Sequence, residues 1–177
     1  MNTAPVTHDR SHTQTAHITV MQGEVFVSTE PKILMTVLGS CVAVCLWDRV
    51  RRVGGMNHFV LPRDPRGENN TRYGDVAIEE LESGLLWLGC KAADLQAKVF
   101  GGAAVLAVRG GEAVGTSNVR LALTWLDRHR IPVVARRTGG TLGQQIRFNT
   151  ATGEVLFRYL AHSPHTTPMP ADPPRLD

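Results

Sequence analysis

The sequence lacks an apolar run long enough to cross a membrane, and it contains only three cysteines. A membrane-spanning helix needs about 18 or more consecutive apolar residues, and no stretch of this chain approaches that length. The cysteines, Cys41, Cys45 and Cys90, are odd in number and do not have the spacing of a disulfide framework. The first residues are polar and lack the apolar segment of a signal peptide. We therefore expect a cytoplasmic protein without membrane insertion, whose thiols stay reduced.

Aromatic residues and concentrated positive charge are also scarce. Aromatic residues make up 6% of the chain, and its formal net charge is only +3. A nucleic-acid-binding surface usually combines a basic stripe with aromatic residues, so no nucleic-acid partner is expected. The paired glycines at 54–55, 101–102, 110–111 and 139–140 form no GxGxxG or Walker pattern. They indicate turns or close backbone approaches instead of nucleotide binding.

The composition predicts one domain between two polar tails. Residues 1–17 are rich in threonine and histidine without periodicity, and residues 163–177 are rich in proline. Both compositions are typical of disordered segments. The domain is expected to extend over residues 18–162, which is long enough to bury a hydrophobic core.

Short strands dominate the predicted domain. Segments rich in β-branched residues predict strands over 18–27, 33–47, 52–61, 95–108, 131–137, 144–148 and 154–159, the last two joined by a hairpin turn at 151–153. Apolar residues at helical spacing predict helices around residues 78–88 and 119–126. Asp75 is the expected N-cap of the first helix and Gly89 its end, and residues 116–118 are cap candidates for the second. Because strands and helices do not alternate strictly, we expect an α+β layered fold.

One cysteine lies in a context that suits nucleophilic chemistry. Gly39 and Ser40 interrupt a mostly apolar segment just before Cys41. Such a break can direct the thiol into a cleft and leave nearby backbone N–H groups free to hold the oxyanion of an acyl-transfer intermediate. Free cysteines are more often small hydrophobic core residues, so Cys41 taken alone favours a structural role.

A hairpin register connects Cys41 with a candidate base. If segments 33–47 and 52–61 form an antiparallel hairpin around residues 48–51, the numbers of paired residues sum to 99. Cys41 then lies opposite His58 on one face, with Cβ atoms about 4.5–5.5 Å apart, which suits a hydrogen bond between thiol and imidazole. Taken alone, His58 is more simply a strand-end residue bonded to the backbone. Both interpretations stay open here, since an odd loop length or a bulge would turn His58 to the other face.

Six blocks of residues resemble, in order, the chemoreceptor glutamine deamidase CheD family. They are LGSCVAVCLWD at 38–48, GGMNHFVLP at 54–62, RYGDVAIEEL at 72–81, AKVFGGA at 97–103, the Gly115 and Asn118 pair, and GGTLGQQIRF at 139–148. The match covers about residues 23–159 and leaves both tails outside. The resemblance implies a β-sandwich flanked by helices, as in the catalytic domain of cytotoxic necrotizing factors. It also implies hydrolysis of selected chemoreceptor glutamine side chains to glutamate and ammonia.

The resemblance implies roles for individual residues. The family's nucleophile falls on Cys41 and its histidine on His58, while Thr36 lies near the position of a threonine that orients the imidazole. On a regular strand, the odd separation between Thr36 and Cys41 would place the two on opposite faces, unless a bulge at Gly39 restores the orientation. An ordinary strand residue is the alternative for Thr36. The matching blocks also supply residues expected at the oxyanion site or in the cleft: Ser40, Asn57, Gly101 and Gly102.

The implied partners are methyl-accepting chemoreceptors as substrates and the chemotaxis phosphatase CheC as a binding protein. Two other functions fit the same residues: a non-catalytic module that docks on receptors or CheC, and a methylesterase of receptor glutamyl esters that uses the same thioester chemistry. The thioester mechanism needs no cofactor. Cys41 and Cys45 would lie about 13 Å apart on one strand, too far to share an ion, so no metal site is expected.

Overall fold

The computed structural model describes residues 15–104 and 112–160 of the chain. The Pro-rich tail predicted at 163–177, and all but the end of the tail predicted at 1–17, lie outside the described residues. Within the described part, the elements follow one another as β1 (Ala16–Thr19), β2 (Val25–Ser28), β3 (Lys32–Leu38), β4 (Val42–Asp48), β5 (Val53–Asn57), α1 (Gly74–Trp87), the short 3-10 helix η1 (Ala92–Asp94), β6 (Leu95–Gly101), α2 (Val114–Arg128), β7 (Val133–Thr138), β8 (Gln144–Asn149) and β9 (Val155–Tyr159).

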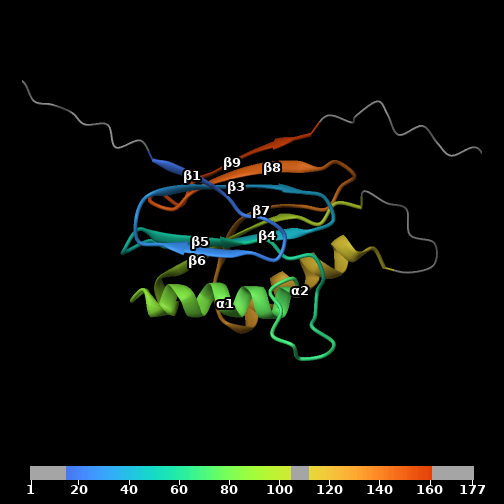
Figure 1. Cartoon of the computed structure of the whole chain (residues 1–177), viewed down its shortest axis with the longest axis horizontal. Coiled ribbons are helices and arrows are strands. Elements are labelled where there is room, and N and C mark those ends of the chain that lie inside the picture. The colour runs from blue at the N-terminus through green and yellow to red at the C-terminus, as the bar shows by residue number, and fades with distance from the viewer. Residues whose placement is uncertain (1–14, 105–111, 161–177) are drawn as a thin grey trace, which may run out of the picture.

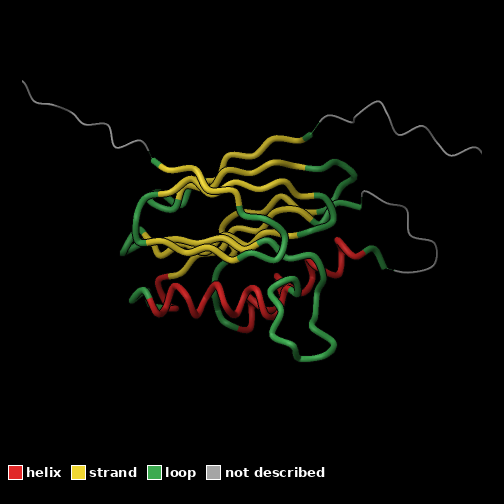
Figure 2. The backbone as a smooth tube through the Cα atoms, in the orientation of Figure 1, coloured by secondary structure: helices red, strands yellow, loops and turns green. Residues whose placement is uncertain are grey.

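Two β-sheets pack face to face, and both helices cover the free face of one of them (Figure 1). The outer sheet has the strand order β1-β3-β8-β9, and the central sheet has the order β2-β5-β4-β6-β7. Both sheets are mixed, because β1 runs parallel to β3 and β7 runs parallel to β6 while the other neighbours are antiparallel. Figure 2 shows the resulting layers, with the strands above and the helices below. The expected α+β layered fold is confirmed, and both helices lie on one side of it.

The middle strands of the central sheet, β5, β4 and β6, are buried on both faces. Val44 and Leu46 of β4 face the helices, while Ala43 and Cys45 face the outer sheet. A strand covered on both sides has an almost continuous apolar sequence instead of an alternating one, which explains the run VAVCLW at 42–47. The candidate site lies at the end of this strand, in the layer between the two sheets.

Two long predicted strands are each divided in the structure. The segment predicted over 18–27 becomes β1 and β2, and the segment predicted over 33–47 becomes β3 and β4. In both cases the two halves belong to different sheets. The side chains on both sides of each break face the same inter-sheet core, so apolar residues continue through the break and the sequence pattern does not mark the crossing.

β1 begins inside the stretch predicted to be disordered. The strand starts at Ala16, which pairs with Lys32 of β3, two residues before the predicted domain start at residue 18. Three of the four side chains of β1 are exposed. Its backbone hydrogen bonds, and not apolar burial, hold the strand in place, and backbone pairing leaves no mark in the composition.

The predicted helix caps are wrong, although the helices themselves and the end of the first are confirmed. α1 ends just before Gly89, which has φ +85°. Its N-cap is Tyr73, and Asp75 lies in the first turn, where its carboxylate accepts the N–H of Asp64 at 3.1 Å. α2 starts at Val114, so residues 116–118 lie within the helix. The hairpin between β8 and β9 at residues 151–153 is confirmed.

Neither helix in residues 15–104 and 112–160 has the length and apolar character required to cross a membrane.

Candidate active site

β4 and β5 form the predicted hairpin in a register two residues away from the predicted one. Cys45 pairs with Met56, so the numbers of paired residues sum to 101 and not to 99. The loop spans residues 49–52, because Asp48 remains in β4 and its carboxylate accepts the N–H groups of residues 50 and 51 at 2.8 and 2.9 Å. These hydrogen bonds hold the pKa of Asp48 below its usual range despite its burial. A shift of two residues leaves each side chain on its predicted face.

Cys41 and His58 consequently face the same layer, but they do not lie directly opposite each other. Val42 bridges Phe59 at the start of the pairing, which places His58 diagonally to Cys41. Both side chains are buried, with 7% and 3% of their surface exposed. Within the described residues, no hydrogen bond joins the Cys41 thiol to the imidazole. The prediction that Cys41 and His58 share a face is confirmed. The prediction that they pair directly is wrong, because His58 lies opposite Ala43, two residues further along β4.

Cys41 lies in the crossing between the sheets, where two glycines of β6 and its continuation hold its backbone. The carbonyl of Cys41 accepts the N–H of Gly102 at 2.8 Å, and the carbonyl of Gly39 accepts the N–H of Ala103 at 2.8 Å. Gly101 has φ +102°, and a Cβ there would lie 2.2 Å from the Cys41 carbonyl oxygen. The N–H of Gly102 is therefore engaged, and these glycines hold the Cys41 loop by close backbone contact.

Asn118 holds the same loop from the helix side. This residue of α2 is fully buried, and its Nδ2 donates to the carbonyls of Ser40 at 3.0 Å and Val60 at 2.8 Å. The Ser40 carbonyl lies just before Cys41, and the Val60 carbonyl lies two residues after His58. The sequence suggested a helix cap for Asn118, whereas the structure makes it a clamp between the two halves of the site.

Asn57 does not enter the cleft. Its neighbours Met56 and His58 face the outer sheet, so the side chain of Asn57 points towards the helices. There its Oδ1 accepts the backbone N–H of Val44 at 2.9 Å. The buried amide thus joins β5 to β4, and its place in the structure is that of a residue that stabilises the sheet.

Thr36 contacts the ring of His58. The Thr36 Oγ1 lies 2.8 Å from His58 Nδ1, and the same hydroxyl donates to the carbonyl of Val20 at 2.8 Å. That carbonyl also lies 3.4 Å from Nδ1. Because the carbonyl can only accept, this arrangement favours the tautomer in which the hydroxyl donates to Val20 and Nδ1 carries the ring proton.

The other ring nitrogen, Nε2, is then the unprotonated one in the neutral imidazole. It is buried and has no hydrogen-bond partner among the described residues. A basic nitrogen that is held in one tautomer and left unpaired has the arrangement required of a general base.

The crossing between the sheets explains why Thr36 reaches the site. Alternation along one regular strand would place Thr36 and Cys41 on opposite faces, but β3 ends at Leu38 and Cys41 lies beyond the break. Thr36 belongs to the outer sheet and points inward with Leu34 and Leu38. A change of sheet, and not a bulge, brings the hydroxyl to the histidine.

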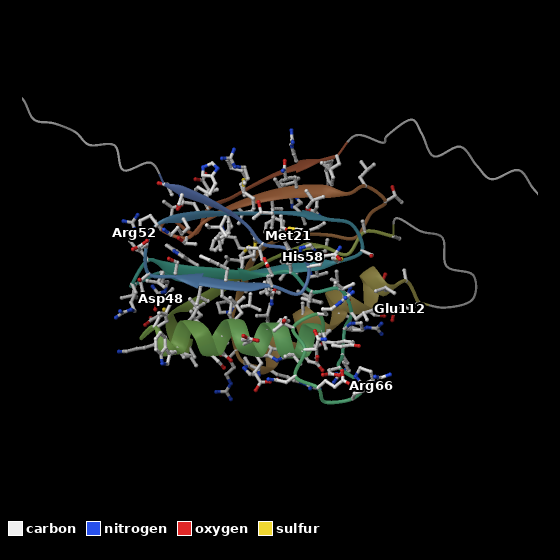
Figure 3. All side chains as sticks on the ribbon, in the orientation of Figure 1. Met21, Asp48, Arg52, His58, Arg66 and Glu112 are labelled. Carbon is white, nitrogen blue, oxygen red and sulfur yellow. The ribbon has the colours of Figure 1, made fainter. Side chains whose placement is uncertain are left out.

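A cavity of about 410 Å³ opens beside His58, where β1 ends and leaves the edge of β3 uncovered. Figure 3 shows His58 between the two sheets, near Met21. The side chains that border the cavity include Met21, Gln22, Met35, Thr36, His58 and Gln145. The Nε2 of Gln22 lies 3.8 Å from the Cys41 sulfur. Gln22 is not among the site residues predicted from the sequence, because residues 18–27 were predicted as one strand. The only signal of a turn there is Gly23, which follows it.

Comparison with known proteins identifies the family. The model of the family described as "CheD chemotactic sensory transduction" matches residues 60–159, more than half of the chain. The chain belongs to the CheD family. The matched range begins after His58, so the assignment to CheD does not depend on the candidate nucleophile and base.

Curated CheD relatives match most of this chain. "Probable chemoreceptor glutamine deamidase CheD" of Rhodospirillum rubrum is 56% identical over 137 residues, which cover 77% of this chain and 78% of the relative. "Probable chemoreceptor glutamine deamidase CheD 1" of Anaeromyxobacter dehalogenans is 47% identical over 146 residues, which cover 82% and 85%. Among solved structures, the Bacillus licheniformis hypothetical protein YfiH aligns at 18% identity with a TM-score of 0.43, over 66% of this chain and 51% of that chain.

Burial favours the neutral forms of both groups in this CheD site. Burial lowers the pKa of His58 below its usual value, although the Val20 carbonyl and Glu24 act in the opposite direction. Burial also raises the pKa of the Cys41 thiol, opposed by its own backbone N–H and by the charge of Arg72. Both shifts favour a thiol and a neutral imidazole over a thiolate–imidazolium ion pair. Within residues 15–104 and 112–160, no group of three His, Cys, Asp or Glu side chains is placed to hold a metal ion.

Proposed function

We propose that this chain is a protein-glutamine deamidase that converts selected chemoreceptor glutamine side chains into glutamate and ammonia, with Cys41 as the nucleophile and His58 as the base. The curated relatives bear the name of that activity. The observation that carries the assignment of residues is the environment of His58: its Nδ1 lies 2.8 Å from the Thr36 hydroxyl, and its buried Nε2 has no partner among the described residues. Cys41 adds a thiol at the end of a loop that several backbone contacts hold in place.

The proposed reaction proceeds in two halves through a thioester. His58 Nε2 takes the proton of the Cys41 thiol as the sulfur attacks the Cδ of the glutamine, and the carbonyl oxygen becomes an oxyanion. The imidazolium then gives its proton to the amide nitrogen, and the C–N bond breaks to release ammonia. In the second half, His58 takes a proton from water as the water oxygen attacks the thioester carbon. The C–S bond breaks, the proton returns to sulfur, and the net reaction is amide plus water to carboxylic acid plus ammonia.

Mass spectrometry of a chemoreceptor fragment incubated with the protein tests this function. Each converted glutamine exchanges an amide for a carboxyl group and adds about one dalton. Release of methanol from a methylated fragment would show the methylesterase activity instead. Binding to CheC, the cytoplasmic location and the likeness to cytotoxic necrotizing factors stay predictions.

The pH dependence of kcat/KM distinguishes the neutral pair from an ion pair. Because burial lowers the pKa of His58, we expect the rate to rise with pH and to reach half its plateau below about pH 6.5, the usual midpoint of histidine. The plateau should extend past about pH 8.5, the usual pKa of a thiol, since burial raises the pKa of Cys41. Rates measured between about pH 4.5 and 9.5 check both limbs. A decline that begins near neutral pH would contradict the neutral pair.

Replacement of Thr36 by valine tests the orientation of the imidazole. Valine keeps the branched shape but removes the hydroxyl that accepts from Nδ1, so the ring loses its fixed tautomer. We expect kcat to fall about 100-fold, at the lower end of what a positioned general base contributes. Thr36→Ser keeps the hydroxyl and should stay within several-fold of the wild type. Equal activity of the valine and serine variants would exclude the orienting role.

A further inference from the structure

The geometry points to Gln22 as a catalytic residue, whose side-chain amide donates a hydrogen bond to the oxyanion of the tetrahedral intermediate. This inference rests on the proposed deamidation at Cys41. The Nε2 of Gln22 lies 3.8 Å from the Cys41 sulfur, at the border of the cavity that reaches His58. Gln22 comes from the turn between β1 and β2 and makes this contact with Cys41 across 19 residues of sequence.

The distance suits an oxyanion donor. The oxygen of a tetrahedral thiol adduct lies about 2.6 Å from the attacking sulfur, and a donor must lie about 2.7–3.1 Å from that oxygen. An amide nitrogen 3.8 Å from the sulfur can satisfy both conditions when the oxyanion, bonded to the substrate carbon, turns towards the amide. An amide NH2 also carries two hydrogens, so it can donate to a developing negative charge on oxygen.

The backbone that carries Gln22 is bonded to the residue that supplies the base. The N–H of Gly23 donates to the carbonyl of His58 at 2.7 Å, and the N–H of His58 donates to the carbonyl of Glu24 at 3.0 Å. The turn itself is closed by the N–H of Glu24, which donates to the carbonyl of Met21 at 3.0 Å. Gly23 has φ +80°, the conformation that a type II turn requires at its third position. The backbone positions of Gln22 and His58 are therefore fixed relative to each other, which contributes to the preorganisation that oxyanion stabilisation requires.

Most other N–H donors near Cys41 are already bonded to other groups and cannot also bind the oxyanion. The N–H of Gly102 is bonded to the Cys41 carbonyl, and the amide of Asn118 is bonded to two carbonyls. Asn57 faces the helices. The backbone N–H of Cys41 makes no hydrogen bond to another backbone group among the described residues, and it lies close enough to its own sulfur to lower the pKa of the thiol. Gln22 and this N–H together provide the pair of donors that acyl-transfer sites use.

Gln22→Ala tests the inference on the full chain with the receptor-fragment assay. We expect kcat to fall about 100- to 1,000-fold with KM changed less than about threefold, since the lost hydrogen bond strengthens only in the transition state. Gln22→Glu, which has the same length but an acceptor in place of the donor, should lose at least as much. Because Gln22 is exposed, neither substitution should change the midpoint of thermal unfolding by more than about 2 °C.

Alkylation of Cys41 by iodoacetamide separates stabilisation of the oxyanion from activation of the thiol. The alkylation passes through no oxyanion, so its rate at Cys41, followed by peptide mass, should be the same in Gln22→Ala and in the wild type. A matched control is Gln96→Ala, at the end of β6 remote from Gly101, which should keep full activity.

Two results would overturn the inference while the proposed function stands. One is a Gln22→Ala variant with more than half of the wild-type kcat, and the other is a parallel loss of deamidation and alkylation, which would assign Gln22 to thiol positioning. A wild-type chain that produces no mass shift would instead refute the proposed function, and this inference with it.

Discussion

A chain in which Cys41 is replaced by alanine is expected to produce no deamidation of a chemoreceptor fragment. The alanine leaves His58 and the cavity in place but removes the atom that forms the thioester, and the loss of a nucleophile of this kind lowers kcat by about 10⁴-fold or more. The measurement is the mass of the fragment after incubation with the variant and with the wild type side by side. Complete absence of the one-dalton increments in the variant, with clear increments in the wild type, is the expected result.

Cys45→Ala is the matched control for that experiment. Cys45 is 1% exposed within the core between the sheets, and burial raises its thiol pKa far above the usual range. Its removal should cost about 1 kcal/mol of unfolding free energy and leave the deamidation rate within twofold of the wild type. A Cys41→Ala variant that still deamidates would show that the nucleophile is another residue. Full restoration of chemotaxis by Cys41→Ser in a deletion strain would favour the docking function over catalysis.

Gly101→Ala is expected to damage both stability and activity, although the residue carries no reactive group. Its φ of +102° disfavours any side chain, and the new Cβ would lie 2.2 Å from the Cys41 carbonyl oxygen. Left-handed backbone costs about 1–2 kcal/mol for a non-glycine residue, and overpacking in a tight contact costs about 1–3 kcal/mol more. The sum is a large fraction of the roughly 5–15 kcal/mol that stabilises a domain. Any relief of the clash must move the Cys41 loop, and a displacement of about 1 Å can lower the rate about 100-fold.

Gly67→Ala separates the effect of backbone strain from the effect of the steric clash. Gly67 also has positive φ, at +67°, but no atom lies within 4 Å of the position that its Cβ would take. Its substitution should therefore cost only the backbone strain and leave kcat unchanged. Urea unfolding and the deamidation rate, measured for both variants, provide the comparison. If Gly101→Ala loses no more stability and activity than Gly67→Ala, the glycine does not hold the nucleophile loop.

Periodicity along the chain was enough to predict which face Cys41 and His58 share. Side chains alternate with a period of two residues, so a register shift of two residues leaves each side chain on the same face. The change of the pairing sum from 99 to 101 therefore left both residues on the inter-sheet face. The register itself was set by Asp48, whose carboxylate binds the loop N–H groups and keeps it in β4. Two side-chain hydrogen bonds of this kind favour one of two hairpins that have equally good apolar patterns.

The sequence alone thus determined the layered α+β class, the two helices, the end of α1 at Gly89, and the pair of residues proposed as nucleophile and base. All of these depend on local periodicity, on turn chemistry or on the blocks that resemble the CheD family. Only the tertiary structure decided where the strands change sheets, how Thr36 reaches the imidazole, and that Asn118 and Gln22 come from distant segments to the same loop. The physical reason is that an apolar pattern specifies which way a side chain faces but not which sheet its strand joins. The contacts that complete the site, such as Asn118 to Ser40 across 78 residues, exist only after both sheets and α2 have packed.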